Sequence, residues 1–420
     1  MSALIVEGGR PLRGTVRVQG AKNSVLPILA ACILAPGESV IHNCPGLSDV
    51  DASVEILRHL GCRVEQRGDT LAVDASAPTG CCVPDRLMRE MRSSVIFLGA
   101  ILGRMGEASM SFPGGCELGP RPIDLHLAAI RALGAQVEER GGGLFCRGDS
   151  LTGCEITLSI PSVGATENAM LTAVAAQGVT TINNAAREPE IVDLQGFLRT
   201  LGARVRGAGT SMITVEGGGP LHGGEFTVMA DRIVAATYLS AAAAAGGQVE
   251  LLGADYRHLS TVTAALAEAG CDVRSTPEVI RLDCTAPLRG VRPIRTAPYP
   301  GFPTDAQPPL MAAMCRGEGT TVFVENIFDS RYRHVDELVR MGADIKVEGR
   351  VAVVCGVPRL HGARLQAADL RGGAALAVAA LGAEGRSVIT GLAHVDRGYQ
   401  SLEGDLSCLG ARIRRVDEDS

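Results

Sequence analysis

The chain has 420 residues, which is too long for one ordinary hydrophobic core, so two or more domains are expected. Hydrophobic residues make up 46% of it, and 40 basic against 46 acidic residues give a net charge of −6. This profile is typical of a soluble globular protein and disfavours nucleic acid as the main partner. The start lacks the features of a secretion signal, and the apolar stretch 233–245 is shorter than a membrane span.

The thirteen cysteines form an odd count, with no CxxC pair and no His/Cys cluster at the spacing of metal ligands. This pattern indicates a reducing, cytoplasmic location with mostly buried structural thiols, and it predicts no metal site. Cys32 and Cys315, which lie in apolar segments, are expected to be buried thiols of this kind.

A repeat of about 70 residues runs along the whole chain. The pattern "LG-small-x-V" and looser copies of it recur with their glycines 68 to 73 residues apart, at positions 61, 134, 202, 270, 342 and 410. A second marker, an Ala-rich segment followed by glycine and a short β-rich run, keeps the same phase. Two markers in fixed phase indicate a duplicated supersecondary unit present six times.

Each repeat predicts the order βαβαββ, as the third copy illustrates. Residues 168–176 predict a helix that Gly178 ends, and "VTTINN" predicts a strand. Residues 192–201 predict a second helix, and "ARVRG" is expected to pair with "SMITVEG". Because the Ala-rich helices carry little polar surface, six such units predict two α/β domains with buried helices and outer sheets.

The segment "QGAKNSVLPILAA" places Lys22 and Asn23 at the start of an apolar helix. A cation is unfavourable at the positive end of a helix, so it fits an anionic ligand held between the lysine and the helix. The alternative is a solvated lysine. The segment "PSVGATENAM" offers a similar turn, where the N–H groups of residues 162–164 could hold a phosphate.

The loop "SFPGGCELGPRP" carries Cys116 and Arg121 among glycines and prolines that exclude helix or strand. A thiol in such a polar loop, close to a guanidinium, is a candidate reactive cysteine. The alternative is one more structural thiol among the thirteen.

Two further segments carry candidate charged groups. In "PYPGFPTDAQPP", five prolines hold Asp305 just before a helix, which suits either a general base or a helix N-cap. Arg331, Arg371 and Arg397 could be surface arginines. Glycine directly follows the last two, which would leave each guanidinium uncrowded for a carboxylate or phosphate.

Together these segments resemble one known family, the UDP-N-acetylglucosamine 1-carboxyvinyltransferases, which are enolpyruvyl transferases. The resemblance runs in order from about residue 4 to residue 416 and rests on "GAKNSVLPILAA", "PGGCELGPRPIDLHL", "SVGATENAM", "NNAAREPEIVDL", "YPGFPTDAQ", "RHVDELVRMGAD" and "HVDRGYQSLEGDLSCLGA".

The resemblance implies a fold of two inside-out α/β barrels, each built from three βαβαββ units. It assigns residues 22–229 to the first domain and residues 1–21 plus 230–420 to the second, with the active site in the cleft between them.

The implied reaction moves the enolpyruvyl group of phosphoenolpyruvate to the 3′-hydroxyl of the GlcNAc in UDP-N-acetylglucosamine and releases phosphate. It is an addition followed by an elimination, and it begins peptidoglycan synthesis in the cytoplasm, which links the family to cell wall biogenesis, cell shape and cell division.

The family's motifs imply a role for each matching residue. Cys116 would be the general acid, the site of a covalent phospholactoyl adduct and the target of fosfomycin, and Asp305 would be the general base. Phosphoenolpyruvate would be bound by Lys22, Asn23, Arg121, Arg371 and Arg397, with Lys22, Asn23 and Arg397 also catalytic. UDP-N-acetylglucosamine would be contacted by Arg92, Arg121, Pro122, Ile123, Asp124, Leu125, Ser162, Val163, Gly164, Asp305 and Ile327.

The resemblance implies no cofactor, no metal and no partner beyond these two small molecules, and it leaves the oligomeric state open. Two alternatives remain: another enolpyruvyl transferase, such as the shikimate-pathway synthase, and a non-catalytic or regulatory UDP-sugar-binding paralogue. The family's shikimate-pathway synthases have no equivalent of the Cys116 loop, and a pure binding protein needs no proton donor.

Overall fold

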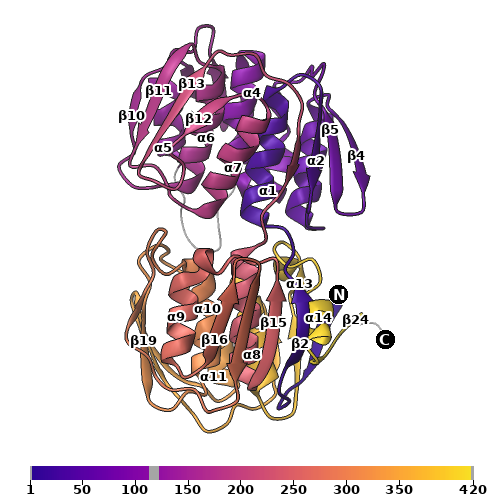
Figure 1. The fold of residues 1–420 in the computed structure, drawn as a ribbon, viewed down its shortest axis with the longest axis vertical. Coiled ribbons are helices and arrows are strands. Elements are labelled where there is room, and N and C mark those ends of the chain that lie inside the picture. The colour runs from indigo at the N-terminus through magenta and orange to yellow at the C-terminus, as the bar shows by residue number, and fades with distance from the viewer. Residues whose placement is uncertain (1, 113–122, 418–420) are drawn as a thin grey trace. The chain divides into compact units, whose positions relative to one another are not determined.

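The computed structural model describes residues 2–112 and 123–417, and the described chain divides into two compact units. Unit 1 comprises residues 2–19 and 230–417, and unit 2 comprises residues 20–112 and 123–229. The described residues form six four-stranded sheets, three in each unit. Figure 1 shows the strands and helices of each unit.

The strands of unit 1 lie in the sheets β22-β23-β1-β24, β16-β17-β15-β2 and β18-β19-β21-β20. They are β1 (Ser2–Glu7), β2 (Arg13–Arg17), β15 (Gly247–Leu252), β16 (Asp272–Thr276), β17 (Val279–Cys284), β18 (Ile294–Arg295), β19 (Thr320–Val324), β20 (Asp344–Glu348), β21 (Val351–Cys355), β22 (Arg364–Gln366), β23 (Arg386–Thr390) and β24 (Arg412–Asp417). Its helices are α8 (Arg232–Ala245), α9 (Ser260–Glu268), α10 (Gln307–Met314), α11 (Val335–Arg340), α12 (Leu370–Gly382), α13 (Leu392–Val395) and α14 (Leu402–Cys408).

The strands of unit 2 lie in the sheets β14-β3-β5-β4, β6-β7-β9-β8 and β10-β11-β13-β12. They are β3 (Glu38–His42), β4 (Arg63–Arg67), β5 (Thr70–Asp74), β6 (Cys82–Val83), β7 (Glu107–Ser111), β8 (Gln136–Arg140), β9 (Gly143–Arg147), β10 (Glu155–Thr157), β11 (Gly178–Asn183), β12 (Arg204–Arg206), β13 (Met212–Gly217) and β14 (Glu225–Thr227). Its helices are α1 (Lys22–Ala31), α2 (Ser48–His59), α3 (Asp85–Glu90), α4 (Phe97–Met105), α5 (Asp124–Ala132), α6 (Val163–Ala175) and α7 (Pro189–Thr200).

Every sheet has the same pairing, which is the structural form of the repeat. A short edge strand runs parallel to its neighbour, and the other two strands follow antiparallel, as in β10-β11-β13-β12. In unit 1 the strands β1 and β2 from the start of the chain complete two of the sheets. The predicted α/β class with duplicated units is confirmed.

The repeated glycines share one backbone conformation. At positions 61, 134, 202, 270, 342 and 410 the φ angle is 92°, 96°, 96°, 106°, 95° and 86°, where a side chain is unfavourable. Each of these glycines follows a helix and precedes a strand, as Gly202 does between α7 and β12. The glycine therefore recurs because each copy of the unit makes the same turn.

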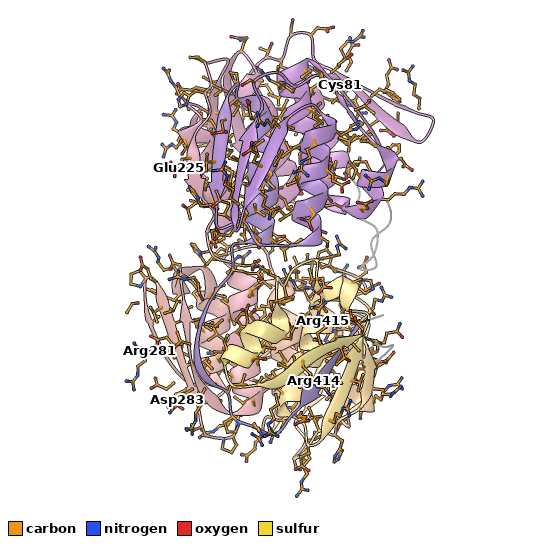
Figure 2. The ribbon with its side chains drawn as sticks, turned by 90° about the vertical axis from the view of Figure 1, so that its right-hand side faces the viewer. Cys81, Glu225, Arg281, Asp283, Arg414 and Arg415 are labelled. Carbon is orange, nitrogen blue, oxygen red and sulfur yellow. The ribbon has the colours of Figure 1, made fainter. Side chains whose placement is uncertain are left out.

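The helices at the centre of each unit are buried on all sides, as their apolar composition predicts. In unit 1, α8, α10 and α12 pack against one another, and in unit 2, α4 packs against α1 and α6. Gly99 of α4 shows why small residues occur there, since a Cβ atom would lie 2.7 Å from the carbonyl oxygen of Asn168 in α6. The sheets turn a polar face outward, and Figure 2 shows Arg281 and Asp283 projecting from β17.

Two boundaries in the third repeat differ from the prediction. Helix α6 begins at Val163, earlier than predicted, and its C-cap is Ala176. Gly178, predicted to end the helix, is instead the first residue of β11. The helix has already ended at Ala176, and the φ of 96° at Gly178 belongs to the turn into the strand. Helix α7 begins at Pro189, since proline suits the first helical turn.

Twelve cysteines lie in the described residues, all of them as free thiols, and seven are buried. Cys32 and Cys315 are among the buried ones, as expected, and burial raises the pKa of Cys315 to about 12. Such thiols remain protonated and unreactive near neutral pH.

A substitution at one repeat glycine tests the turn. In Gly134→Ala the Cβ atom would lie no closer than 3.4 Å to any neighbour, so its cost comes from the φ of 96°. We expect the free energy of unfolding to fall by about 1–2 kcal/mol, measured by denaturant titration. Gly219→Ala is the control, because that glycine has no neighbour within 4 Å and no positive φ. Equal effects of the two substitutions would contradict the explanation.

Candidate active site

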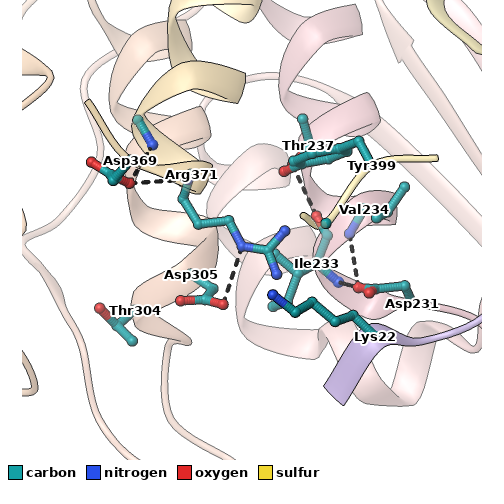
Figure 3. Close-up of polar contacts among 12 residues, drawn as sticks. Lys22, Asp231, Ile233, Val234, Thr237, Thr304, Asp305, Asp369, Arg371 and Tyr399 are labelled. Atoms are coloured by element: carbon teal, nitrogen blue, oxygen red, sulfur yellow. Dashed lines mark hydrogen bonds and ion pairs between the residues drawn. The ribbon is translucent and has the colours of Figure 1, made fainter. Parts of the chain in front are cut away.

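The candidate site residues of unit 1 lie where its central helices begin. Asp231 is the N-cap of α8, Asp305 lies in the short 3₁₀ turn Thr304–Ala306 that leads into α10, and Arg371 is the second residue of α12. The three helices pack against one another, and Asp305 and Asp231 both lie near enough to the Arg371 guanidinium to favour its charge. Figure 3 shows these side chains in the same region of the unit.

Asp305 is held by two arginines. Its Oδ1 accepts a hydrogen bond of 2.7 Å from Arg331 Nη2, and its Oδ2 accepts one of 3.1 Å from Arg371 Nε. The two guanidiniums are only 1% and 2% exposed, whereas the carboxylate is 28% exposed. The Asp305 side chain caps no helix, so the N-cap alternative is wrong. The surface-arginine alternative is wrong for Arg331 and Arg371.

Arg331 also fixes the backbone beside Asp305. Its Nε and Nη2 donate to the carbonyl oxygen of Thr304 at 3.2 and 2.9 Å. Thr304 in turn donates its hydroxyl to the buried Glu325 at 3.0 Å. This network holds the backbone and the side chain of Thr304, the residue before Asp305, which favours one fixed position for the carboxylate.

Glu325 also organises the loop that contains Ile327. Its Oε1 accepts hydrogen bonds from the amides of Ile327 at 2.8 Å and Phe328 at 3.0 Å. The Ile327 amide is therefore already used within the protein. A backbone contact of Ile327 with a sugar would have to use the carbonyl oxygen, which can accept but not donate a hydrogen bond.

Arg371 is placed by its own helix start. Asp369 caps α12, and its Oδ1 accepts from the amides of Arg371 at 3.0 Å and Gly372 at 2.8 Å. Burial opposes the charge of this guanidinium, but the nearby Tyr399, Asp305 and Asp231 outweigh burial and raise its pKa. Arg371 therefore stays positively charged although water hardly reaches it.

The glycines after Arg371 and Arg397 allow close packing of neighbouring side chains. They do not leave the guanidiniums uncrowded, which corrects the explanation from sequence. A Cβ atom on Gly372 would lie 2.7 Å from Asp369 Oδ2 and 3.0 Å from His334 Cβ. A Cβ atom on Gly398 would lie 2.8 Å from Leu370 and 3.3 Å from Arg371 Nη1. The half-buried Arg397 thus precedes a glycine whose added Cβ atom would contact the Arg371 guanidinium.

Gln19 forms hydrogen bonds with the loop that carries Arg397. Its Nε2 donates to the carbonyl oxygen of Gly398 at 3.2 Å, and its Oε1 accepts from the amide of Gln400 at 2.8 Å. Asp396 forms an ion pair of 2.6 Å with Arg415 on the other side of Arg397. Side chains far away in sequence thus hold the turn that carries Arg397.

In unit 2, Lys22 is the first residue of α1, and its Nζ lies 2.8 Å from Asp49 Oδ2 in the first turn of α2. The lysine side chain is 9% exposed and the aspartate 2%, so the solvated-lysine alternative is wrong. Within unit 2 an anion does offset the charge at the helix start, and it is the Asp49 carboxylate. Asn23, the next residue, is exposed.

The turn at residues 162–164 starts helix α6. Ser162 is its N-cap and accepts the amide of Ala165 at 3.4 Å, and Val163 and Gly164 are half-buried. The first amides of a helix have no acceptor within it, but the Ser162 amide already donates to the carbonyl oxygen of Ile160 at 2.7 Å. The amides of Val163 and Gly164 are therefore the candidates for an anion at this turn. A Cβ atom on Gly164 would lie 2.8 Å from the His126 ring, which explains the glycine.

Asn168 joins three segments around this helix start. Its amide group donates to Val95 O at 3.0 Å and to His126 Nδ1 at 2.7 Å, and it accepts from the amide of Gly99 at 2.7 Å. His126 Nδ1 is therefore the acceptor, and burial lowers the pKa of this histidine to about 4. The asparagine thus fixes the 3₁₀ turn Arg92–Ile96 that begins with Arg92.

The remaining predicted residues fall in two groups. Ile123, Asp124 and Leu125 begin α5, where Asp124 is exposed and the other two are half-buried. Cys116, Arg121 and Pro122 lie outside the described residues.

The sequence does not point to Asp369, Glu325, Asp49 or Asn168, and it predicts no role for Arg331. Only Asp369 carries a local signal, because an aspartate directly before an Ala-rich helix is a typical N-cap.

No helix in the described part of the chain has the length and apolar character that a membrane crossing requires. Among the described residues, no three His, Cys, Asp or Glu side chains gather as metal ligands would.

The fold of two units, each with three repeated four-stranded sheets, is that of the enolpyruvyl transferases. The chain belongs to the EPSP synthase (3-phosphoshikimate 1-carboxyvinyltransferase) family, whose model matches residues 6–406.

Curated relatives match the chain over nearly its full length. A UDP-N-acetylglucosamine 1-carboxyvinyltransferase 2 of Caldanaerobacter subterraneus is 51% identical, covering 99% of this chain and 100% of the relative. A UDP-N-acetylglucosamine 1-carboxyvinyltransferase 1 of Symbiobacterium thermophilum is 50% identical, covering 98% and 95%. The resemblance found in the sequence is confirmed.

Solved structures agree with this fold. The enolpyruvyl transferase NikO from Streptomyces tendae is 28% identical, with a TM-score of 0.88 and 99% of each chain covered. An EPSP synthase from Acinetobacter baumannii has a TM-score of 0.76 at 20% identity, with 99% of this chain and 100% of that chain covered, and so shows the fold alone.

A buried acidic cluster in unit 2 gives a testable pH dependence. Burial, with Glu190 and Glu188 nearby, raises the pKa of the Glu167 carboxyl from 4.5 to about 8. A raised carboxyl pKa stabilises the fold fully below the unfolded value, and this contribution is lost as pH rises through the folded value. Relative to Glu167→Gln, we therefore expect the wild-type chain to lose stability between pH 5 and pH 8.

Thermal unfolding of both proteins at pH 5, 6, 7 and 8 measures this difference, which approaches at most about 1.4 kcal/mol per pH unit. Glu216→Gln, an exposed change on β13 in the same unit, is the control and should show a flat profile. A difference between wild type and Glu167→Gln that stays constant with pH would show that Glu167 is already ionised at pH 5.

Proposed function

We propose that this chain transfers the enolpyruvyl group of phosphoenolpyruvate to the 3′-hydroxyl of the GlcNAc in UDP-N-acetylglucosamine and releases phosphate, the committed step into peptidoglycan. The observation that carries this proposal is the match at about half identity, over nearly the whole chain, to relatives named for this activity. Such a match favours the same substrates over those of the shikimate-pathway synthase, whose solved structure is 20% identical.

The chemistry needs an acid and a base. Phosphoenolpyruvate accepts a proton at C3 while C2 accepts the sugar oxygen, and the sugar hydroxyl loses its proton. We assign the acid and the phospholactoyl adduct to Cys116 and the base to Asp305. The contacts of Asp305 support the role of base, because two buried arginines and the Thr304 backbone give the carboxylate a fixed position.

The anionic groups of the substrates need cations. We assign Lys22, Arg121 and Arg397 to the phosphate and carboxylate of phosphoenolpyruvate, with Arg371 at the carboxylate, and Asn23 to the reacting centre. The buried positive charge of Arg371 supports this role, because a guanidinium binds a carboxylate strongly where water is excluded. Phosphoenolpyruvate is here a co-substrate, and no separate cofactor is assigned.

The sugar nucleotide uses the remaining predicted residues. We assign uridine to residues 121–125, the diphosphate to Arg92 and to the amides of residues 162–164, and the sugar to Asp305 and the Ile327 backbone. The helix start at Ser162 supports the diphosphate assignment for the amides of Val163 and Gly164, since the first amides of a helix have no acceptor within it, whereas the Ser162 amide already donates to Ile160.

Phosphate release from phosphoenolpyruvate in the presence of UDP-N-acetylglucosamine tests the function. The wild-type chain should release one phosphate for each enolpyruvyl product, and Asp305→Ala should lose about 10²–10⁴-fold in kcat while still binding the sugar nucleotide. Near-normal turnover of Asp305→Ala would remove Asp305 from the base role. Sugar-nucleotide binding without phosphate release by the wild type would favour the non-catalytic paralogue.

Covalent labelling tests the acid. The epoxide fosfomycin should add one label to the wild-type chain and none to Cys116→Ser, as mass spectrometry of the intact protein measures. Cys408→Ser, which replaces an exposed cysteine of unit 1, is the control and should still be labelled. A label that persisted in Cys116→Ser would assign the reactive thiol elsewhere.

A further inference from the structure

The Arg371 guanidinium has one nitrogen with a hydrogen-bond acceptor and one without among the described residues. Its Nε donates to Asp305 Oδ2 at 3.1 Å, but its Nη1 is buried and has no hydrogen-bond acceptor among the described residues. The side chain is 2% exposed, so little water reaches that nitrogen. A buried charged N–H group without an acceptor is destabilising, which marks Nη1 as the position of an absent acceptor.

Among the described residues, no neighbour of Arg371 has an acceptor in hydrogen-bond geometry with Nη1, although the Tyr399 hydroxyl lies close enough to favour the charge of the guanidinium. The backbone of Gly398 lies next to Nη1, and the guanidinium carbon lies 5.5 Å from the centre of the Tyr399 ring. Asp369 Oδ1 binds amides of α12, whereas its buried Oδ2 has no hydrogen-bond donor among the described residues, Nη1 included. The Tyr399 hydroxyl bonds to Thr237 at 2.8 Å (Figure 3). Among the described residues of unit 1, further charged or titratable groups near this cluster include Asp231, Arg331, Glu325 and His334.

We propose that Asp305 and the substrate carboxylate share Arg371. The presence of either anion weakens the binding of the other anion to this arginine. This inference rests on the proposed function, which supplies a carboxylate for Nη1. One guanidinium charge is divided between two anions in a site of low dielectric, so the second anion binds less tightly than it would alone. The coupling is reciprocal, as for any two ligands of one group.

This sharing gives phosphoenolpyruvate a second role. In the free chain Asp305 lies between two guanidiniums, and opposite charges favour the ionised form of a carboxylate and disfavour proton uptake. A carboxylate at Nη1 draws Arg371 away electrostatically and increases the tendency of Asp305 to accept a proton. The base would therefore become effective only when the co-substrate is bound.

Reciprocity gives a prediction that runs against the usual effect of damaging a site. Asp305→Asn should bind phosphoenolpyruvate about tenfold more tightly than the wild type, measured by titration calorimetry without the sugar nucleotide. In an Arg371→Gln background, Asp305→Asn should change the affinity less than twofold. Asp272→Asn, which removes an exposed carboxylate 2.7 Å from Arg274 in the same unit, should also have no effect.

The Asp305→Asn variant leaves two buried arginines without their carboxylate, which favours misfolding. A double variant in which the charge change is balanced controls for this effect. Arg331→Met with Asp305→Asn removes one positive and one negative charge, and it should bind phosphoenolpyruvate about tenfold more tightly than Arg331→Met alone. Equal affinities in this comparison would overturn the sharing of Arg371, as would a tightening that persists in the Arg371→Gln background.

Turnover of the wild type separates this inference from the proposed function. If the wild type releases phosphate but Asp305→Asn binds phosphoenolpyruvate no more tightly, the sharing of Arg371 is wrong and the function stands. If the wild type neither releases phosphate nor binds phosphoenolpyruvate, the proposed function fails and the sharing fails with it.

Discussion

Two positive charges lie almost completely out of contact with water in unit 1, and the Asp305 carboxylate touches both of them. Removing one partner of such a buried pair costs about 3–5 kcal/mol, because the other charge is left without compensation. Arg331 and Arg371 are therefore not spare contacts of a catalytic aspartate. Asp305 offsets only one of these two charges, so an anionic substrate that binds there meets guanidiniums that a single carboxylate does not fully neutralise.

The duplicated unit explains why these charges lie where they do. Each unit packs its central helices side by side, so the ends of the helices meet. In unit 1 the starts of α8, α10 and α12 carry Asp231, Asp305 and Arg371. In unit 2, α1 begins with Lys22 and α6 follows Ser162. These helix starts share a positive potential, but capping aspartates already accept the first amides of α8 and α12, so the charged side chains distinguish one helix start from another.

The repeat and the class of fold were predictable because they depend on local constraints. A turn that needs a φ near 95° requires glycine in every copy, and helices buried on all sides require alanine and leucine. The candidate residues were predictable from local context and from the resemblance, which rests on motifs. Helix boundaries were less accurate, as Gly178 shows, because a strand and a helix C-terminus both accept glycine there.

The contacts that define the site could not be predicted, because they join residues far apart in the sequence. Asp305 meets Arg371 across 66 positions and Arg331 across 26, and no local pattern distinguishes such a paired carboxylate from a helix cap. The same holds for Lys22, whose partner Asp49 lies on another helix. A sequence shows which ionisable groups are present, and the fold decides which charges remain partly unsatisfied. Arg371, paired at Nε and open at Nη1, is the clearest such case in unit 1.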